Sequence, residues 1–261
     1  MPAAIARAAI APVLAEPRVR AEQLTQLLLG ETAAVVDSSA EWRRVCTTVD
    51  GYDGWIHAGY LIEVQDSTAD EWRARATGWS EGAVLRVGDV QLALPLRARV
   101  ALAGDAVELP DGRRGRVATG SIREMSEILS AARAKAPERW ALEHFVGSPY
   151  QWGGVTPWGV DCSGLVQTTF AARGVVLPRD SARQVAHGAT VSLDAIRPGD
   201  LLFFRSESGG GINHVAFAGE ADTLVHSTLA CGGTLVEPWL PGTRAATLRQ
   251  RLVAVRRLEE R

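Results

Sequence analysis

The chain has 261 residues, a net charge of −2 at pH 7 and a hydrophobic fraction of 46%. This length suits one large domain or two to three small ones, and the apolar content is sufficient for packed cores. Because no basic run, basic tail or long apolar stretch occurs, neither nucleic acid nor a membrane is an expected partner.

The first 15 residues mimic a signal peptide that ends at a small-residue site. However, Arg7 and Pro12 interrupt the apolar run, and the segment also fits a first strand. The chain contains three cysteines that are far apart: Cys46, Cys162 and Cys231. They make no disulfide framework, which favours a reducing compartment. We therefore expect a cytoplasmic protein.

The first half of the chain has the pattern of short strands separated by turns. Brief apolar or β-branched runs alternate with turn residues, and Asp111-Gly112 is typical of a hairpin. Strands are expected at residues 35–36, 43–47, 54–56, 72–79, 83–87, 90–94, 98–102, 106–109 and 116–119. Two small β-barrels would account for residues 8–122.

The second half changes character. Apolar residues at helical spacing predict helices over residues 122–134 and 137–146, and a third helix that starts near Cys162 and ends at Gly174. Strands of one sheet are expected at residues 201–204, 214–218, 223–226 and 252–255. Helices followed by antiparallel strands indicate an α+β domain.

Cys162 stands where the third helix begins. A thiol attacks only as the thiolate, and the first turn of a helix favours an anion, so we expect this position to favour the thiolate. Asp161 can cap the turn, and Ser163-Gly164 lets another segment of backbone approach closely. The Cys162 N–H is a candidate oxyanion donor, and the Tyr150 hydroxyl is a candidate second donor.

His214 and His226 lie in two strand-like runs separated by a turn. Reflection of position 214 about a turn centred near residue 220 gives position 226, so the two imidazoles are expected to be cross-strand neighbours on one face. His214 would be the base that activates Cys162, and His226 would hold it in one tautomer.

Other interpretations of these residues stay open. Cys162 could be a buried structural thiol, and the histidines could be satisfied core residues. A Cys/His/His metal site would need a fourth ligand, and none stands at a telling spacing. Cys46 and Cys231 lack a base at a meaningful distance. No metal or cofactor is expected.

These residues together resemble the NlpC-type cysteine peptidases, which are papain-like α+β peptidoglycan hydrolases with a Cys-His-His triad. The resemblance covers about residues 123–261 and rests on residues 149–164, Arg179-Asp180-Ser181 with Gln184, residues 197–201 and the two histidines. It implies Cys162 as nucleophile, His214 as general base and His226 as the orienting third member. Tyr150 would lie near the oxyanion, and three residues would line the substrate cleft: Asp161, Asp180 and Ser181.

The upstream half resembles paired bacterial SH3-like barrels, on the pattern of residues 22–31 and 50–56. The predicted organisation is a first SH3-like barrel over residues 1–66, a second over residues 67–122, and a papain-like NlpC-type domain over residues 123–261. The fold class is therefore α+β, with two small all-β barrels before the catalytic domain.

Two such barrels before an NlpC-type domain resemble the cytoplasmic γ-D-glutamyl-L-diamino-acid endopeptidases. These cleave murein tripeptides and tetrapeptides that carry a free N-terminal L-alanine, during cell-wall peptide recycling. In that subfamily the first barrel caps the site and supplies a tyrosine and an acid to the ammonium. Tyr52 is the candidate tyrosine here, and the candidate acids are Glu22, Asp53 and Glu16.

Two other functions remain as alternatives. A papain-like scaffold also supports an amidase or acyltransferase on another substrate, because fold does not fix substrate. The SH3-like barrels could instead make the chain a non-catalytic wall-binding module. The sequence does not indicate the oligomeric state or the preferred diamino acid.

Overall fold

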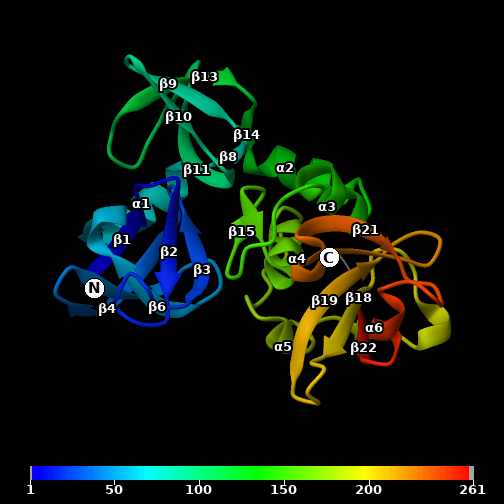
Figure 1. The fold of residues 1–261 in the computed structure, drawn as a ribbon. Helices are drawn as coiled ribbons and strands as arrows, with labels where there is room; N and C mark the ends of the chain where they lie inside the picture. Colours follow the sequence, from blue (N-terminus) through cyan, green and yellow to red (C-terminus); the bar gives the residue numbers. More distant parts are fainter. Residues whose placement is uncertain (1, 259–261) are drawn as a thin grey trace. The chain divides into compact units, whose positions relative to one another are not determined.

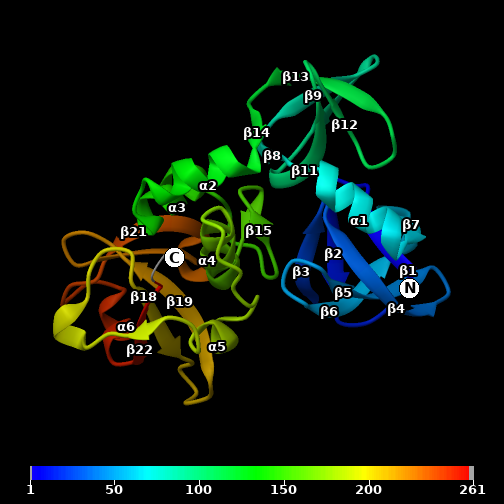
Figure 2. The same ribbon diagram turned by 180° about the vertical axis from the view of Figure 1, so that it is seen from behind.

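The structure is a computed structural model in which residues 2–258 are described. The chain divides into two compact units, Met1–Ile128 and Leu129–Arg261, and each is described by itself. Figures 1 and 2 show the elements of both units from opposite sides.

Two seven-stranded sheets form most of the first unit. Their strand orders are β3-β2-β6-β5-β4-β1-β7 and β10-β9-β13-β12-β11-β8-β14. The strands are β1 Pro2–Ala6, β2 Ile10–Leu14, β3 Gln23–Leu28, β4 Thr32–Ser39, β5 Trp42–Thr47, β6 Asp53–His57, β7 Leu61–Gln65, β8 Gly78–Glu81, β9 Val84–Val87, β10 Val90–Ala93, β11 Leu96–Ala103, β12 Ala106–Glu108, β13 Arg114–Thr119 and β14 Ile122–Glu124. The segment with signal-like composition thus contributes β1 and β2.

Each sheet encloses apolar side chains in the way expected of a small barrel. The first core gathers side chains such as Ala4, Val13, Val45 and Ile56, all fully buried. The second gathers Leu85, Val100 and their neighbours, together with Leu29, which follows β3. Two all-β SH3-like barrels were expected here, and this part of the fold prediction is confirmed.

One predicted strand is wrong. Residues 72–79 were expected to be extended, but helix α1, Asp66–Arg75, occupies the first half of this stretch and β8 begins only at Gly78. The helix buries Ala69 and Trp72, and the Trp72 indole N–H donates to the Gly30 carbonyl at 2.8 Å. Apolar and polar side chains alternate in residues 72–79 as they would in a strand. The helix forms because it buries the Trp72 indole against β1 and β11.

The second unit is a six-stranded sheet with helices on both faces. Its order is β17-β22-β18-β19-β20-β21. The strands are β17 Ala189–Thr190, β18 Leu201–Arg205, β19 Ile212–Ala218, β20 Thr223–Thr228, β21 Gly233–Pro238 and β22 Leu252–Arg257; a separate two-stranded pair joins β15 Val155–Thr156 to β16 Gly159–Val160. The helices are α2 Met125–Arg133, α3 Pro137–Phe145, α4 Cys162–Ala171, α5 Ser181–Gln184 and α6 Ala246–Arg249.

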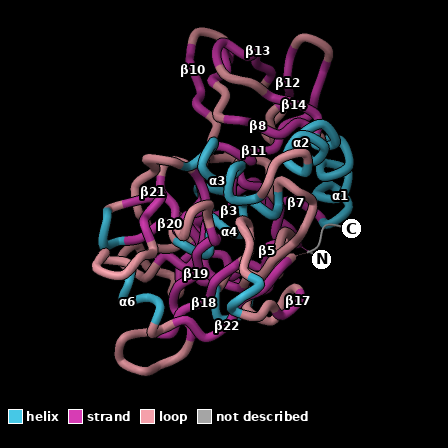
Figure 3. The backbone as a smooth tube through the Cα atoms, turned by 90° about the vertical axis from the view of Figure 1, so that its right-hand side faces the viewer, coloured by secondary structure: helices cyan, strands magenta, loops and turns pink. Residues whose placement is uncertain are grey.

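The two faces of this sheet pack against different helices. Phe217 meets Phe170 of α4 on one face, with ring centroids 6.1 Å apart. On the opposite face, Phe204 and Ala216 belong to a cluster that includes Leu248 of α6. Figure 3 colours these helices separately from the strands. The α+β class of the catalytic domain is therefore confirmed, although β17 and β21 were missed.

Within residues 2–258, no helix combines the length and the apolar character that crossing a membrane would require.

Candidate active site

The site is built on the first turn of α4. Asp161 is its N-cap, and its carboxylate accepts hydrogen bonds from the backbone N–H of Gly164 at 2.7 Å and of Gly153 at 2.8 Å. A Cβ atom on Gly164 would lie 2.1 Å from the Gly154 carbonyl oxygen, so only glycine allows this approach. The preceding loop is thereby fixed against the helix end that carries Cys162.

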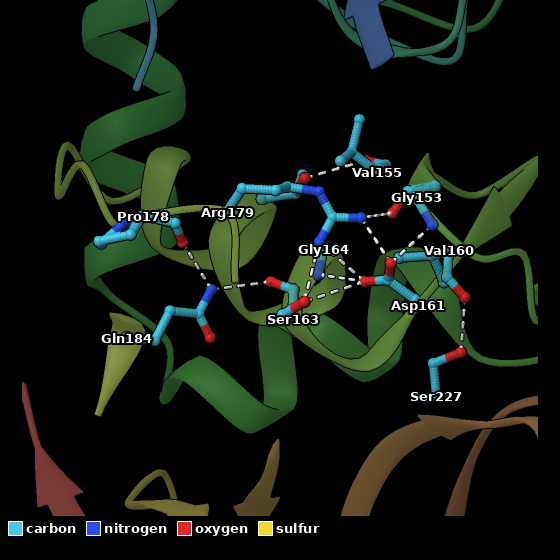
Figure 4. A network of polar contacts seen from close by, with 12 residues as sticks. Gly153, Val155, Val160, Asp161, Ser163, Gly164, Pro178, Arg179, Gln184 and Ser227 are labelled. Atoms are coloured by element: carbon cyan, nitrogen blue, oxygen red, sulfur yellow. Dashed lines mark hydrogen bonds and ion pairs between the residues drawn. The ribbon is translucent and has the colours of Figure 1, made fainter. Parts of the chain in front are cut away.

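A buried arginine completes this support (Figure 4). Arg179 donates to both carboxylate oxygens of Asp161, at 3.0 and 2.5 Å, and to the Ser163 hydroxyl at 2.8 Å. Both members of the ion pair are almost fully buried, so removal of either would leave an uncompensated charge. Asp161 was expected to line the substrate cleft, but its carboxylate is already used inside the protein. The sequence motif contained Arg179 without indicating this role.

The thiol of Cys162 differs from expectation. It is 7% exposed, and burial together with the charge of Asp161 raises its pKa to about 12. Hydrogen bonds from the backbone N–H groups of Val215 and Ser163 act in the opposite direction and are outweighed. The helix start alone therefore does not hold an anion here, because desolvation penalises the charged form more strongly. The raised pKa favours the neutral thiol in the free enzyme.

His214 and His226 are in direct contact. Nε2 of His214 lies 2.9 Å from Nδ1 of His226. Their predicted register is wrong by two residues, because Phe217 pairs with Val225. This register places Ala216 opposite His226, so the two imidazoles are diagonal rather than directly opposite. They still share a face, since a shift of two residues preserves the side.

Burial also decides the charge of both imidazoles. It lowers the pKa of His214 to about 3, with His226 as the second cause, and it lowers the pKa of His226 to about 4. His226 is fully buried, whereas His214 is only partly buried. Neutral rings are the form in which an imidazole can accept a proton from a thiol.

A carboxylate that the sequence reasoning missed lies beyond the histidines. Glu237 of β21 is 3.0 Å from Nε2 of His226 and is 6% exposed. Arg244 donates to the other oxygen of Glu237 at 2.8 Å and also contacts the oxygen that His226 reaches. A strand prediction over residues 233–238 would have placed this acid beside β20.

The remaining predicted residues of the catalytic domain are Tyr150, Asp180 and Ser181. Tyr150 is half-buried, and its pKa is raised to about 12, first by burial and then by the neighbouring Cys162, so the phenol keeps its proton and can donate. Asp180 is the half-buried N-cap of α5, and Ser181 is buried at its first position. Their predicted contact with substrate stays a prediction.

The predicted ammonium-binding residues all lie in the first unit. Asp53 is exposed and pairs with Arg44 at 2.8 Å, and Glu16 pairs with Arg18 at 2.9 Å. Glu22 is exposed, and Tyr52, immediately before β6, is half-buried. The ion pairs of Asp53 and Glu16 both lie at the surface.

All three cysteines are free thiols. Cys231 is exposed and hydrogen-bonds to Arg244, so it has a polar neighbour that the sequence did not suggest. Within residues 2–258, no group of three or more histidine, cysteine or acidic side chains has an arrangement that could hold a metal ion.

A cysteine at the start of a buried helix and a hydrogen-bonded histidine pair on the adjoining sheet define a papain-like cysteine peptidase site. Comparison with known families gives the particular class. Residues 147–239 match the NlpC/P60 family, and residues 13–61 match the bacterial dipeptidyl-peptidase SH3 domain. The chain therefore contains an NlpC/P60 cysteine peptidase domain and, upstream of it, a bacterial dipeptidyl-peptidase SH3 domain.

Curated relatives extend this similarity. A γ-D-glutamyl-L-lysine dipeptidyl-peptidase of Bacillus cereus is 28% identical over 79% of this chain and 67% of its own length. The corresponding protein of Bacillus subtilis is 29% identical over 78% of this chain and 71% of its own length. The probable endopeptidase NlpC of Escherichia coli is 37% identical, but over only 35% of this chain and 60% of its own.

A solved structure supports the fold of the whole chain. The crystal structure of an NlpC/P60 family protein from Bacillus cereus aligns with a TM-score of 0.78, over 98% of this chain and 99% of that chain. The sequence identity in this alignment is 21%, so the likeness establishes fold rather than substrate.

Proposed function

We propose that this peptidase hydrolyses the γ-D-glutamyl–L-diamino-acid amide bond of free murein peptides whose N-terminal L-alanine is unblocked. One observation carries the proposal. The two relatives named γ-D-glutamyl-L-lysine dipeptidyl-peptidase match this chain over 79% and 78% of its length, far beyond the 35% shared with the Escherichia coli NlpC protein. The similarity therefore extends upstream of the catalytic domain.

We propose a reaction that starts from a neutral Cys162 thiol and a neutral His214 imidazole. As the Cys162 sulfur attacks the scissile carbonyl carbon, its proton passes to His214, and the oxyanion is met by the Cys162 N–H and the Tyr150 hydroxyl. His214 then protonates the departing amine, which leaves a thioester. Water attacks the thioester while giving a proton to His214, and the thiol is restored as the dipeptide acid leaves.

Selection of a free amine is proposed to come from the first barrel. Tyr52 and one of the acids Glu22, Asp53 or Glu16 would bind the alanine ammonium. Asp53 and Glu16 would each have to exchange an arginine partner, which lies within 3 Å, for the ammonium. An N-blocked peptide would leave such an acid and hydroxyl without their partner, which penalises binding strongly. Intact wall, whose alanine nitrogen is acylated, would be spared.

We also propose that the enzyme acts inside the cell, on peptides recovered from the wall. Support comes from the cysteines, all of which are free, because an unprotected nucleophilic thiol suits a reducing compartment.

The test compares L-Ala-γ-D-Glu-L-Lys, its diaminopimelate analogue and the N-acetylated form of each. We expect release of L-Ala-D-Glu from the free peptides and a loss of at least about 100-fold in kcat/KM on acetylation. Cys162→Ala should abolish release, whereas Cys231→Ala, the matched control at an exposed thiol, should retain it. Absence of cleavage of the free peptides would refute the proposed substrate.

The same experiment separates the alternatives. Equal cleavage of free and acetylated peptides would contradict amine selection and point to an endopeptidase of intact wall. A stable acyl group on Cys162 with transfer to an added amine would indicate an acyltransferase. Glu22→Gln, Asp53→Asn and Glu16→Gln are compared, and the substitution at the acid that binds the ammonium should raise KM for the free peptide without affecting the acetylated one.

A further inference from the structure

We infer that Glu237 is a positioning residue of the catalytic site, which determines the nitrogen of each imidazole that carries the proton. The inference rests on the roles proposed for Cys162, His214 and His226, but not on the identity of the substrate. Glu237 has no contact with the thiol itself, and its effect would pass through both rings.

The strand register brings the carboxylate to its place. β21 is antiparallel to β20, and His226 is opposite Leu235. Glu237 is two residues further along β21, so it lies on the same face as His226 and diagonal to it. The Glu237 carboxylate and the His226 imidazole are both buried, and Oε2 lies 3.0 Å from Nε2. Few competing partners can reach either group.

The pairing of hydrogen-bond donors with acceptors then determines which nitrogen carries the proton, first in His226 and then in His214. An ionised carboxylate can only accept, so Nε2 of His226 must carry hydrogen. The other nitrogen of a neutral His226, Nδ1, is then an acceptor. It lies 2.9 Å from Nε2 of His214, which must therefore be the donor. Nδ1 of His214 is left without a proton and is the nitrogen available to take the proton from Cys162.

The low pKa values of the rings support this assignment, because burial keeps both imidazoles neutral and a neutral ring has a single proton to place. When His214 takes the thiol proton at Nδ1, the ring becomes a cation. Its Nε2–H still donates to His226, whose Nε2–H still donates to the negative carboxylate. No proton leaves His226 or Glu237 during the step.

Arg244 holds Glu237 from the other side. Its Nε donates to Oε1 at 2.8 Å, and its terminal nitrogen contacts Oε2, so Oε2 receives both Arg244 and His226. The guanidinium is 44% exposed and also touches the Cys231 thiol. The titratable and charged groups around the carboxylate are thus His226 on β20, and Arg244 with its neighbour Cys231.

A purely structural clamp is the competing explanation, since Glu237 also joins β21 to the segment before α6. The two roles differ in what Arg244 does. A clamp fails equally when either partner of the ion pair is lost. If Glu237 instead sets the tautomer of His226, loss of its carboxylate should impair catalysis, whereas Arg244 only helps to hold that carboxylate in position.

The experiment uses the full chain and begins with the wild-type protein. Proton–nitrogen correlation NMR distinguishes the two tautomers of a histidine. We expect both His214 and His226 to be protonated at Nε2 and bare at Nδ1 near pH 7. A proton on Nδ1 of His226 in the wild-type protein would overturn the inference, and this measurement needs neither a substrate nor a variant that folds.

Glu237→Gln then replaces the carboxylate with a group of the same shape that can also donate. We expect partial transfer of the His226 proton from Nε2 to Nδ1. His214 would then carry its own proton at Nδ1, the atom that must accept the proton of Cys162. We therefore expect kcat to fall roughly 10- to 100-fold, with KM little changed. The loss is expected to be smaller than the ~10⁴-fold effect of an amide placed directly beside a catalytic histidine. An unchanged tautomer together with an unchanged kcat would contradict the proposal.

Arg244→Met is the matched control. It should keep the wild-type tautomers and most of the turnover. Equal loss in Glu237→Gln and Arg244→Met with unchanged tautomers would show a clamp and overturn the positioning role. If no murein peptide is cut, the proposed function fails, while the tautomers and the alkylation rate of Cys162 still test Glu237.

Discussion

Burial, more than the helix terminus, controls the ionisation of Cys162 and His214. Desolvation raises the pKa of the thiol to about 12 and lowers the pKa of the imidazole to about 3. The two shifts act in the same sense, because each disfavours the charged form of its group. These shifts favour a neutral thiol and a neutral imidazole in the free enzyme, and we therefore expect the proton to move when the sulfur attacks rather than beforehand.

This charge state predicts the pH dependence of thiol alkylation. Iodoacetamide reacts with the thiolate, and a thiol whose pKa is about 12 has less of it at every lower pH. We expect the alkylation rate of Cys162 to rise about tenfold for each pH unit from pH 5 to 9, without a plateau. The rate would be measured by mass spectrometry of the Cys162 peptide.

Cys231, which is exposed, provides an internal comparison in the same sample. A plateau for Cys162 between pH 5 and 8 would show a preformed thiolate–imidazolium pair and contradict the neutral assignment. The same experiment in His214→Ala would then show whether the imidazole is the cation of that pair.

At the scale of elements, the β19–β20 hairpin determines how the two histidines meet. Gly219 donates its N–H to the Thr223 carbonyl at 2.8 Å, which closes a turn centred on Ala221. Ala221 and Asp222 both have left-handed backbone, at φ of 50° and 52°. This conformation is costly for residues with a Cβ atom. The hairpin therefore retains strain at the point that sets the register of the catalytic strands.

Ala221→Gly should relieve part of this strain. Glycine adopts positive φ without a steric penalty, so we expect the free energy of unfolding of the second unit to rise by about 0.5–1 kcal/mol. Chemical denaturation, followed by a probe within residues 129–261, would measure the change. Ala189→Gly in β17, an exposed position with extended backbone, should instead destabilise slightly. A loss of stability in Ala221→Gly would refute the strain argument.

The sequence predicted many strands because their side chains alternate between core and solvent. It failed where tertiary contacts override local pattern. Residues 72–75 alternate like a strand, but the chain is helical there because Trp72 packs against β1 and β11. Strand β21 was missed because glycines precede it and Pro238 ends it, although its pairing with β20 is extensive.

In the site too, local sequence features were predicted correctly and features that depend on tertiary contacts were not. Cys162, His214 and His226 were identified from residue type and spacing, and the register error of two residues did not change their face. Glu237 could not be assigned without β21, because its role depends on a neighbour eleven positions away in sequence. The helix terminus was expected to favour the thiolate, whereas burial raises the pKa of the Cys162 thiol, because the terminus is a local feature and desolvation depends on the completed fold.

At the scale of the whole molecule, each unit has its own hydrophobic core. The second unit gathers its cluster between the sheet and α6. In the first unit, the two sheets share apolar contacts. Leu29, the residue after β3, belongs to the core of the second sheet, and a further cluster joins Ile5 of the first sheet to Ala101 of the second through Trp72. The two barrels are thus expected to unfold as one cooperative body.

Trp72→Ala tests this coupling. The substitution removes a side chain that is 3% exposed and its hydrogen bond to the Gly30 carbonyl, so we expect a loss of about 3–5 kcal/mol in the free energy of unfolding of the first unit. Hydrogen exchange should increase together in β2–β6 and in β9–β13, since neither sheet keeps its full core alone. Val90→Ala, at an exposed position of β10, should leave both unchanged. Faster exchange confined to one sheet would show that the barrels are independent, because a shared core cannot lose its central side chain and still protect one of its two layers.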